Sequence, residues 1–164
     1  IEGLMALAIV SIFIVLFFSL NSYIDRSFDI TNRQSDLQFY SRLAQIKLKN
    51  EIELCSSLEI CSDAPTVGDE QKAIYVEDGI IMIQSGSGEA TPLIPNIDDD
   101  VEMNISFEKI TKEVGEPELG KRLLGFTITS SGSGDSVELE SSLLIGSNAS
   151  FEIKGETGEA ILYQ

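Results

Sequence analysis

Few residues of this chain have side chains that could do chemistry. Its 164 residues include no His and only two Cys. His is the commonest general base, and the Asp and Glu residues are spread along the sequence without the motif of a nucleophile and its base. We therefore expect no enzyme activity, no catalytic residue and no cofactor.

Cys55 and Cys61 are the only two cysteines, and they lie where a long helix is predicted to end. If this part of the chain faces an oxidising exterior, the short spacing favours a disulfide that would stabilise the fold by about 2–3 kcal/mol. Two free, buried thiols are the alternative. Zinc binding is not expected, because two cysteines without His cannot complete a tetrahedral site.

The densest group of oxygen ligands is formed by Asp98, Asp99 and Asp100. Carboxylate oxygens in a loop are what calcium prefers, but the spacing does not match an EF-hand loop. The three aspartates are thus only a weak calcium candidate, and a solvated acidic turn before a strand is favoured. We assign no metal site.

Glu2 lies directly before a long apolar run. From Leu4 to Leu20 there are 17 residues without a charge, which is the short end for a helix that spans a bilayer. A carboxylate costs about 2.5–3.5 kcal/mol at the bilayer centre and less near its surface, so we expect a cationic partner for Glu2. An ordinary single-pass anchor and an uncleaved signal sequence are the alternatives, and neither needs this acid.

Residues 21–54 are more polar, but they contain no Pro or Gly and keep a helical period. One continuous helix of about 50 residues, about 75–80 Å long, is therefore predicted. Two apolar faces indicate two partners, the protein's own head and either neighbouring subunits or another part of the head; a broadly buried core helix is the alternative. The first face contains Leu37, Tyr40, Ala44, Leu48, Ile52 and Cys55, and the second Phe39, Leu43, Ile46 and Leu54.

After Cys61 the pattern becomes alternating, which is typical of antiparallel strands. Asp78-Gly79 between two apolar runs predicts a β-hairpin. Further strands are expected over 101–107, 123–129 and 137–145, the last two flanking a loop at 130–135, and weaker ones over 151–154 and 160–163. The predicted class is α+β, with a protruding apolar helix at 1–24, an amphipathic helix at 25–54 and a globular antiparallel β head at 55–164.

The head is strongly acidic. Of the formal net charge of −16, residues 55–164 carry −15, from 21 acidic and six basic residues. Binding to nucleic acid needs clustered Lys and Arg, so we expect no nucleic-acid partner.

The opening run Ile1-Glu2-Gly3-Leu4-Met5-Ala6-Leu7-Ala8-Ile9-Val10-Ser11-Ile12 resembles the N-terminal signature of type IV pilins and of type II secretion pseudopilins. The resemblance implies a pilin-like fold in which the long helix packs on an antiparallel sheet. It also implies processing and N-terminal methylation by a prepilin peptidase. In this family residues precede the isoleucine that Ile1 matches, so the mature N-terminus stays open.

The resemblance further implies that Glu2 neutralises the terminal amine of a neighbouring subunit during filament assembly. The partners would be other pilin subunits, an assembly ATPase, a platform protein and the cytoplasmic membrane, with the head outside and the chain ending in a filament at the cell surface. A loose likeness of Leu124–Ile128, Val137–Ser142 and Asn148 to the end of larger minor pseudopilins and minor pilins favours a minor, priming or tip subunit over a major pilin. A tethered binding module that does not polymerise is the rival hypothesis. The residues expected at the subunit interface are Glu2, Leu4, Leu7, Ile9, Ile12, Phe13 and Leu16.

Overall fold

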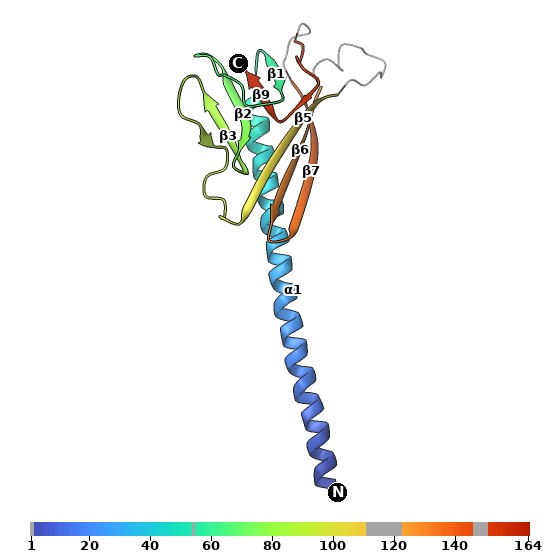
Figure 1. Ribbon diagram of the computed structural model, residues 1–164. Coiled ribbons are helices and arrows are strands. Elements are labelled where there is room, and N and C mark those ends of the chain that lie inside the picture. Colours follow the sequence, from blue (N-terminus) through green and yellow to red (C-terminus); the bar gives the residue numbers. More distant parts are fainter. Residues whose placement is uncertain (1, 54, 111–122, 146–150) are drawn as a thin grey trace, which may run out of the picture. The chain divides into compact units, whose positions relative to one another are not determined.

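The computed structural model describes residues 2–53, 55–110, 123–145 and 151–164 (Figure 1). One helix, α1 (Glu2–Ile52), is followed by β-strands that pair in two antiparallel sheets. The chain divides into two compact units, Ile1–Asp36 and Leu37–Gln164, so the last turns of α1 belong to the unit that contains the sheets. We call these the N-terminal unit and the head. The α+β class is confirmed.

Helix α1 runs without a break from Glu2 to Ile52, which is nearly the whole predicted range. After Gly3 it contains no residue that favours a break, because Pro and further Gly are absent up to Ile52. Its last turn closes with the Glu53 amide donating to the Lys49 carbonyl oxygen at 3.0 Å. The single long helix is thus confirmed.

The first sheet has five strands in the order β1-β9-β2-β3-β4. Its strands are β1 (Leu58–Cys61), β2 (Lys72–Glu77), β3 (Ile80–Ser85), β4 (Thr91–Pro92) and β9 (Ala160–Tyr163). The predicted hairpin is confirmed, because β2 and β3 pair from Glu77–Ile80 outward. Asp78 and Gly79 both have positive φ angles, 50° and 74°, as a tight two-residue hairpin turn requires.

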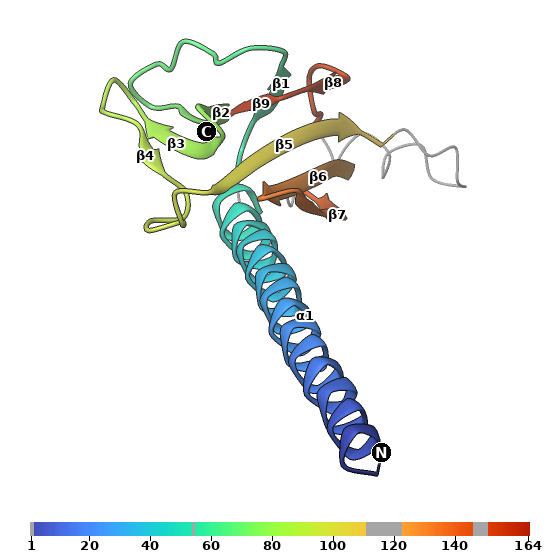
Figure 2. The same ribbon diagram turned by 60° about the horizontal axis from the view of Figure 1, so that its bottom comes forward.

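The second sheet has four strands in the order β7-β6-β5-β8, and β5, β6 and β7 run side by side in Figure 2. Its strands are β5 (Val101–Lys109), β6 (Leu123–Gly132), β7 (Asp135–Leu144) and β8 (Thr157–Gly158). β5 alternates as predicted, with Met103, Ile105 and Phe107 buried. The predicted loop at 130–135 is too long, because the ladder continues to the pair Gly132–Asp135 and leaves only Ser133 and Gly134 in the turn.

One predicted strand is absent. Residues 151–154 form only an isolated parallel bridge between Lys154 and Glu59. The backbone of Lys154 makes both of its bonds there, donating to the Leu58 carbonyl at 3.0 Å and accepting from the Ile60 amide at 2.9 Å. The strand predicted over 160–163 is confirmed as β9, which lies between β1 and β2.

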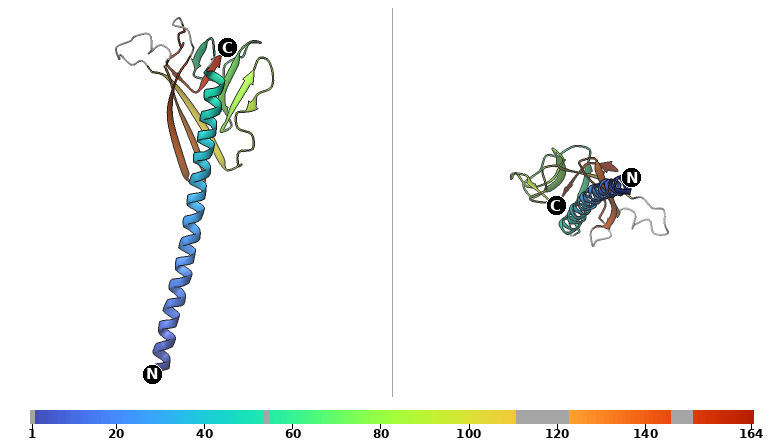
Figure 3. Two further views of the ribbon diagram at one scale, coloured as in Figure 1. Left: turned by 180° about the vertical axis from the view of Figure 1, so that it is seen from behind. Right: turned by 90° about the horizontal axis from the view of Figure 1, so that it is seen from below.

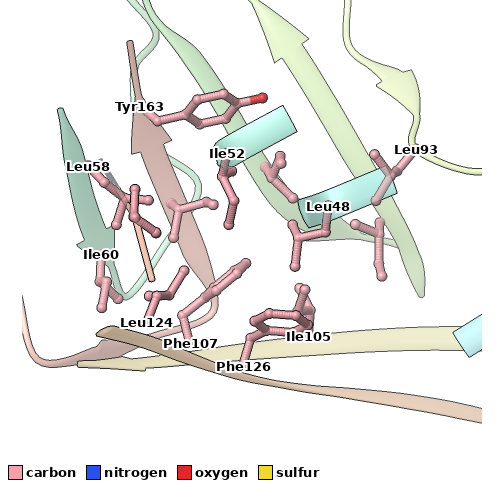
Figure 4. Packing of buried hydrophobic residues seen from close by; sticks show 14 of the residues in the cluster. Leu48, Ile52, Leu58, Ile60, Leu93, Ile105, Phe107, Leu124, Phe126 and Tyr163 are labelled. Carbon is pink, nitrogen blue, oxygen red and sulfur yellow. The ribbon is translucent and has the colours of Figure 1, made fainter. Parts of the chain in front are cut away.

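The core of the head lies between the last turns of α1 and both sheets (Figures 3 and 4). Leu48 and Ile52 from the helix belong to one buried cluster with Phe107 and Phe126 from the second sheet. The first apolar stripe is confirmed, since its members are buried except Tyr40, which is half-buried. The buried members are Leu37, Ala44, Leu48, Ile52 and Cys55.

The second stripe of the helix does not enter this core in the same way. Phe39 and Ile46 are 60% and 55% exposed, and Leu43 is half-buried against the core. Leu54 lies outside the described residues. Within the head, the sheets thus cover one face of the last turns of α1 and leave much of the other face open.

Polar contacts fix how α1 lies against the sheets. The buried hydroxyls of Ser41 on the helix and Ser130 on β6 are 2.7 Å apart and bond to each other. Gln45 donates to the Ser141 hydroxyl on β7 at 2.8 Å, and Lys47 donates to the Leu93 carbonyl at 2.9 Å. These bonds connect the helix to β6 and β7 of the second sheet and to the segment after β4 of the first sheet.

Candidate assembly surface

The residues expected at a subunit interface all lie in the first part of α1. Described by itself, the N-terminal unit buries none of them: Leu4 is 77% exposed, Phe13 67% and Ile9 55%. Leu7, Ile12 and Leu16 are exposed to a similar extent, and Glu2 is exposed as well. This surface, the apolar residues from Leu4 to Leu20, is called the apolar segment below.

The apolar segment has no polar side. At 100° per residue, the predicted interface residues point in several directions around the helix axis, and the residues between Leu4 and Leu16 are apolar too, apart from Ser11. A helix that is apolar all round is covered by lipid or by several protein neighbours. The helix is long and apolar enough to span a membrane.

Ser11 interrupts the apolar segment without exposing an unpaired hydroxyl. Its Oγ donates to the Leu7 carbonyl oxygen, one turn earlier, at 2.8 Å. Because this bond lies within the helix, the serine can enter an apolar environment at reduced cost. Thr31 makes the same bond to Ser27 beyond the apolar segment.

Glu2 is the first residue of α1 and the acid of its first turn. A carboxylate is favourable there, because the unpaired amides at a helix N-terminus give it a partial positive charge. Along the described part of α1, the first basic residue after Glu2 is Arg26, which is about 36 Å further along the helix at 1.5 Å per residue. No basic side chain of this helix can therefore pair with Glu2.

The three aspartates of the calcium candidate are not gathered into a ligand set. Asp98 accepts a hydrogen bond from the Tyr40 hydroxyl at 3.1 Å, and Asp100 accepts one from the Ser133 hydroxyl at 3.2 Å. In the described parts of the chain, no three His, Cys, Asp or Glu side chains converge as a metal site would require. The loop that contains these aspartates instead forms hydrogen bonds with the helix and with the β6–β7 turn.

The disulfide prediction is wrong, because Cys55 and Cys61 are both free thiols. Cys55 is buried in the core, whereas Cys61 follows Ile60 on β1, where alternate side chains face opposite sides. Since Ile60 faces the core, Cys61 points away from Cys55. Burial raises the pKa of Cys55 to about 11. The pKa of Cys61 is also raised, mainly by burial and to a smaller extent by the negative charge of Glu59.

The second sheet carries an acidic surface that was not predicted from the sequence. An open hollow of about 740 Å³ lies on its outer side, lined by hydroxyl groups and by Glu108, Glu140 and Glu159. The alternation in β5 and β7 is visible in the sequence, but only the strand register shows that these side chains share a face. Gly125 leaves room there, because a Cβ at this position would be 2.8 Å from Cγ of Glu108.

Comparison with protein-family models, curated proteins and solved structures finds no match for this chain.

Proposed function

We propose that this protein is a structural subunit of a type IV pilus-like filament or type II secretion pseudopilus. One observation carries the proposal: an apolar segment whose described side chains are exposed begins two residues after Glu2 and continues, in the same helix, into the core of a folded head. A simple membrane tether would need neither the acid nor an unbroken helix. The resemblance of residues 1–12 to pilin N-termini supports the same assignment.

Before assembly, the apolar segment anchors the chain in the cytoplasmic membrane. At 1.5 Å per residue its 17 residues extend about 25 Å, close to the thickness of a bilayer's hydrocarbon core. In the filament the same side chains contact neighbouring helices. Moving them from lipid to protein gains much less than removing them from water, so apolar burial alone cannot select the register of neighbouring helices.

We assign the selection of this helix register to Glu2. A carboxylate among apolar helices is strongly disfavoured unless a cation pairs with it, and no basic residue of its own helix is within reach. The terminal amine of a neighbouring subunit is the cation that the pilin resemblance implies. Pairing with that amine fixes the axial position at which each subunit joins, and this is the role we assign to Glu2.

The exposed acid gives a direct test, Glu2→Ala. We expect this variant to enter the membrane normally, keep a folded head and be lost from filaments. Without the carboxylate, no ion pair fixes the axial position of the helix among its neighbours. Incorporation is measured by quantitative mass spectrometry of sheared surface filaments beside the membrane fraction. Glu89→Ala is the matched control, since it removes an exposed acid of the head. Normal incorporation of Glu2→Ala would reject the mechanism.

The same measurement on the unaltered chain separates the possible roles. Abundant processed chain in the filaments identifies a major pilin, and a trace amount identifies the minor, priming or tip subunit that we favour. Chain confined to the membrane fraction would reject filament assembly and leave a tethered binding module.

A further inference from the structure

The edges of the two sheets differ greatly in length. β8 and β4 have two residues each, β4 contains Pro92, and β1 has four residues and bonds to Lys154. Among the strands of the described residues, β7 is the remaining edge, with ten residues and neither Pro nor Gly. Proteins usually shorten or interrupt exposed edges, because unpaired backbone groups there attract other strands. β7 is therefore an exception within its own fold.

The register shows which backbone groups of β7 make no bond to another strand in the described part of the chain. Gly132 and Asp135 close the two-residue turn, so they form a hydrogen-bonded pair, and bonded and non-bonded pairs alternate from there along the ladder. The Ile110 amide donates to the Leu123 carbonyl, which agrees with this alternation in β6. The outward amides and carbonyls of β7 consequently belong to Leu144 and to four polar residues, Ser136, Glu138, Glu140 and Ser142.

The side chains of those four residues lie on the outer face of the sheet and are exposed. Glu138 and Glu140 lie opposite Thr129 and Thr127 of β6, which lie opposite Asn104 and Ser106 of β5. Among the described residues of the four strands, Lys109 is the one base, and its ammonium group binds Glu152 and the Ile153 carbonyl. The face beside the free edge is thus acidic.

These charges restrict what can pair with the edge. Two copies of β7 paired side by side would place glutamates against one another, and like charges across strands are destabilising. A strand with Lys or Arg beside the glutamates would gain attraction instead. On the inner side, Val137, Leu139 and Leu143 are half-buried and would contact apolar residues at the intervening positions.

We propose that the free edge of β7 docks an extended, basic segment of another protein, which adds a fifth strand to the sheet. The added strand runs antiparallel to β7. Its Lys or Arg residues alternate with apolar residues, and the basic residues lie opposite Ser136, Glu138, Glu140 and Ser142 and bond to them through their backbones. The inference uses only the head and holds whether or not the chain polymerises.

The test uses the full chain in non-ionic detergent micelles and a capped peptide, as long as β7, in which lysine and valine alternate. We expect the peptide to slow hydrogen exchange of the Ser136, Glu138, Glu140 and Ser142 amides at least tenfold. Peptides with identical charge provide the decisive control. Backbone N-methylation at two lysines removes bonds to the edge and should weaken binding on the order of tenfold, whereas N-methylation at two valines should not.

A charge test uses two variants with the same net charge. Glu138→Lys with Glu140→Lys should weaken binding on the order of tenfold, while Asp63→Lys with Glu89→Lys, outside this sheet, should have little effect. Equal binding of the two N-methylated peptides, equal loss in the two variants, or unchanged exchange of the four amides would overturn the proposal. The peptide comparison uses the unaltered protein, so it remains decisive if a variant fails to fold.

Discussion

The N-terminal unit and the head contain similar apolar side chains, but these are exposed in the N-terminal unit and buried in the head. Phe13 is 67% exposed, whereas Phe107 is 2% exposed. The difference lies in how the residues are spaced: the apolar segment is continuous, while β5 alternates and the last turns of α1 have one apolar stripe. Periodic spacing leads to burial within the chain, and a continuous apolar helix is one that lipid or protein neighbours cover.

The two units are consequently stabilised by different means. In the head, burial of apolar area supplies most of the favourable free energy. In residues 2–36 the helical hydrogen bonds are internal, but the described side chains have no core of their own. Substitutions in the apolar segment should therefore act on membrane insertion and assembly, and substitutions in the head should act on folding.

The largest expected effect is on the head core. Phe107→Ala should lower the free energy of unfolding of the head by about 3–5 kcal/mol, because it leaves a cavity among Leu124, Phe126 and the helix. Phe13→Ala should change it by less than about 0.5 kcal/mol. Both are measured by urea unfolding in non-ionic micelles, followed by the circular dichroism of the strands. A large loss from Phe13→Ala would show that the two units are not stabilised separately.

Much of the fold could be predicted because its signals are local. The helix follows from the absence of Pro and Gly, and the β2–β3 hairpin from Asp78-Gly79 between apolar runs. The order of the first sheet could not be predicted, because β9, the last strand in the sequence, lies between β1 and β2. Pairing over about a hundred residues leaves no mark in local periodicity.

The candidate sites, too, could be predicted where their signal is local and could not where it depends on the fold. The apolar segment is defined by consecutive residues and could be found from the sequence. The disulfide prediction failed because sequence spacing does not give the direction of side chains, and the β1 alternation turns Cys61 away from Cys55. The acidic face of the second sheet depends on register, since Glu108 and Glu140 are distant in sequence but line the same hollow.

A smaller effect is expected at the buried serine pair that positions α1 against β6. Ser41→Ala leaves the Ser130 hydroxyl buried without its partner, which should cost about 1–3 kcal/mol. The double variant, with Ser130→Ala as well, should recover part of that loss, because no polar group is then left unpaired. Ser11→Ala in the apolar segment is the control and should leave the head unchanged. Additive losses from the two serines would contradict this role for their hydrogen bond.

The smallest effect is the loss of unfolding free energy per pH unit at alkaline pH. We expect it in the head only. Burial raises the pKa of Cys55 from its ordinary value of 9.0 to about 11, and burial together with Glu51 raises that of Tyr163, whose hydroxyl is 3.4 Å from Oε2 of Glu51. Above pH 9 the unfolded thiol ionises while the folded one stays protonated. The stabilisation present below pH 9 is therefore lost between about pH 9 and 11, at up to about 1.4 kcal/mol per pH unit.

Urea unfolding at pH 8, 9 and 10 measures this slope, and Cys55→Ala identifies its source. The variant should lose most of the dependence between pH 9 and 10, because the Tyr163 contribution begins only above the ordinary pKa of tyrosine, about 10. Cys61→Ala is the matched control, since Cys61 is half-buried and should contribute less. The N-terminal unit contains no cysteine, so the helix signal of residues 2–36 should not change over this range. A slope that survives Cys55→Ala would assign the pH dependence to other groups of the acidic head.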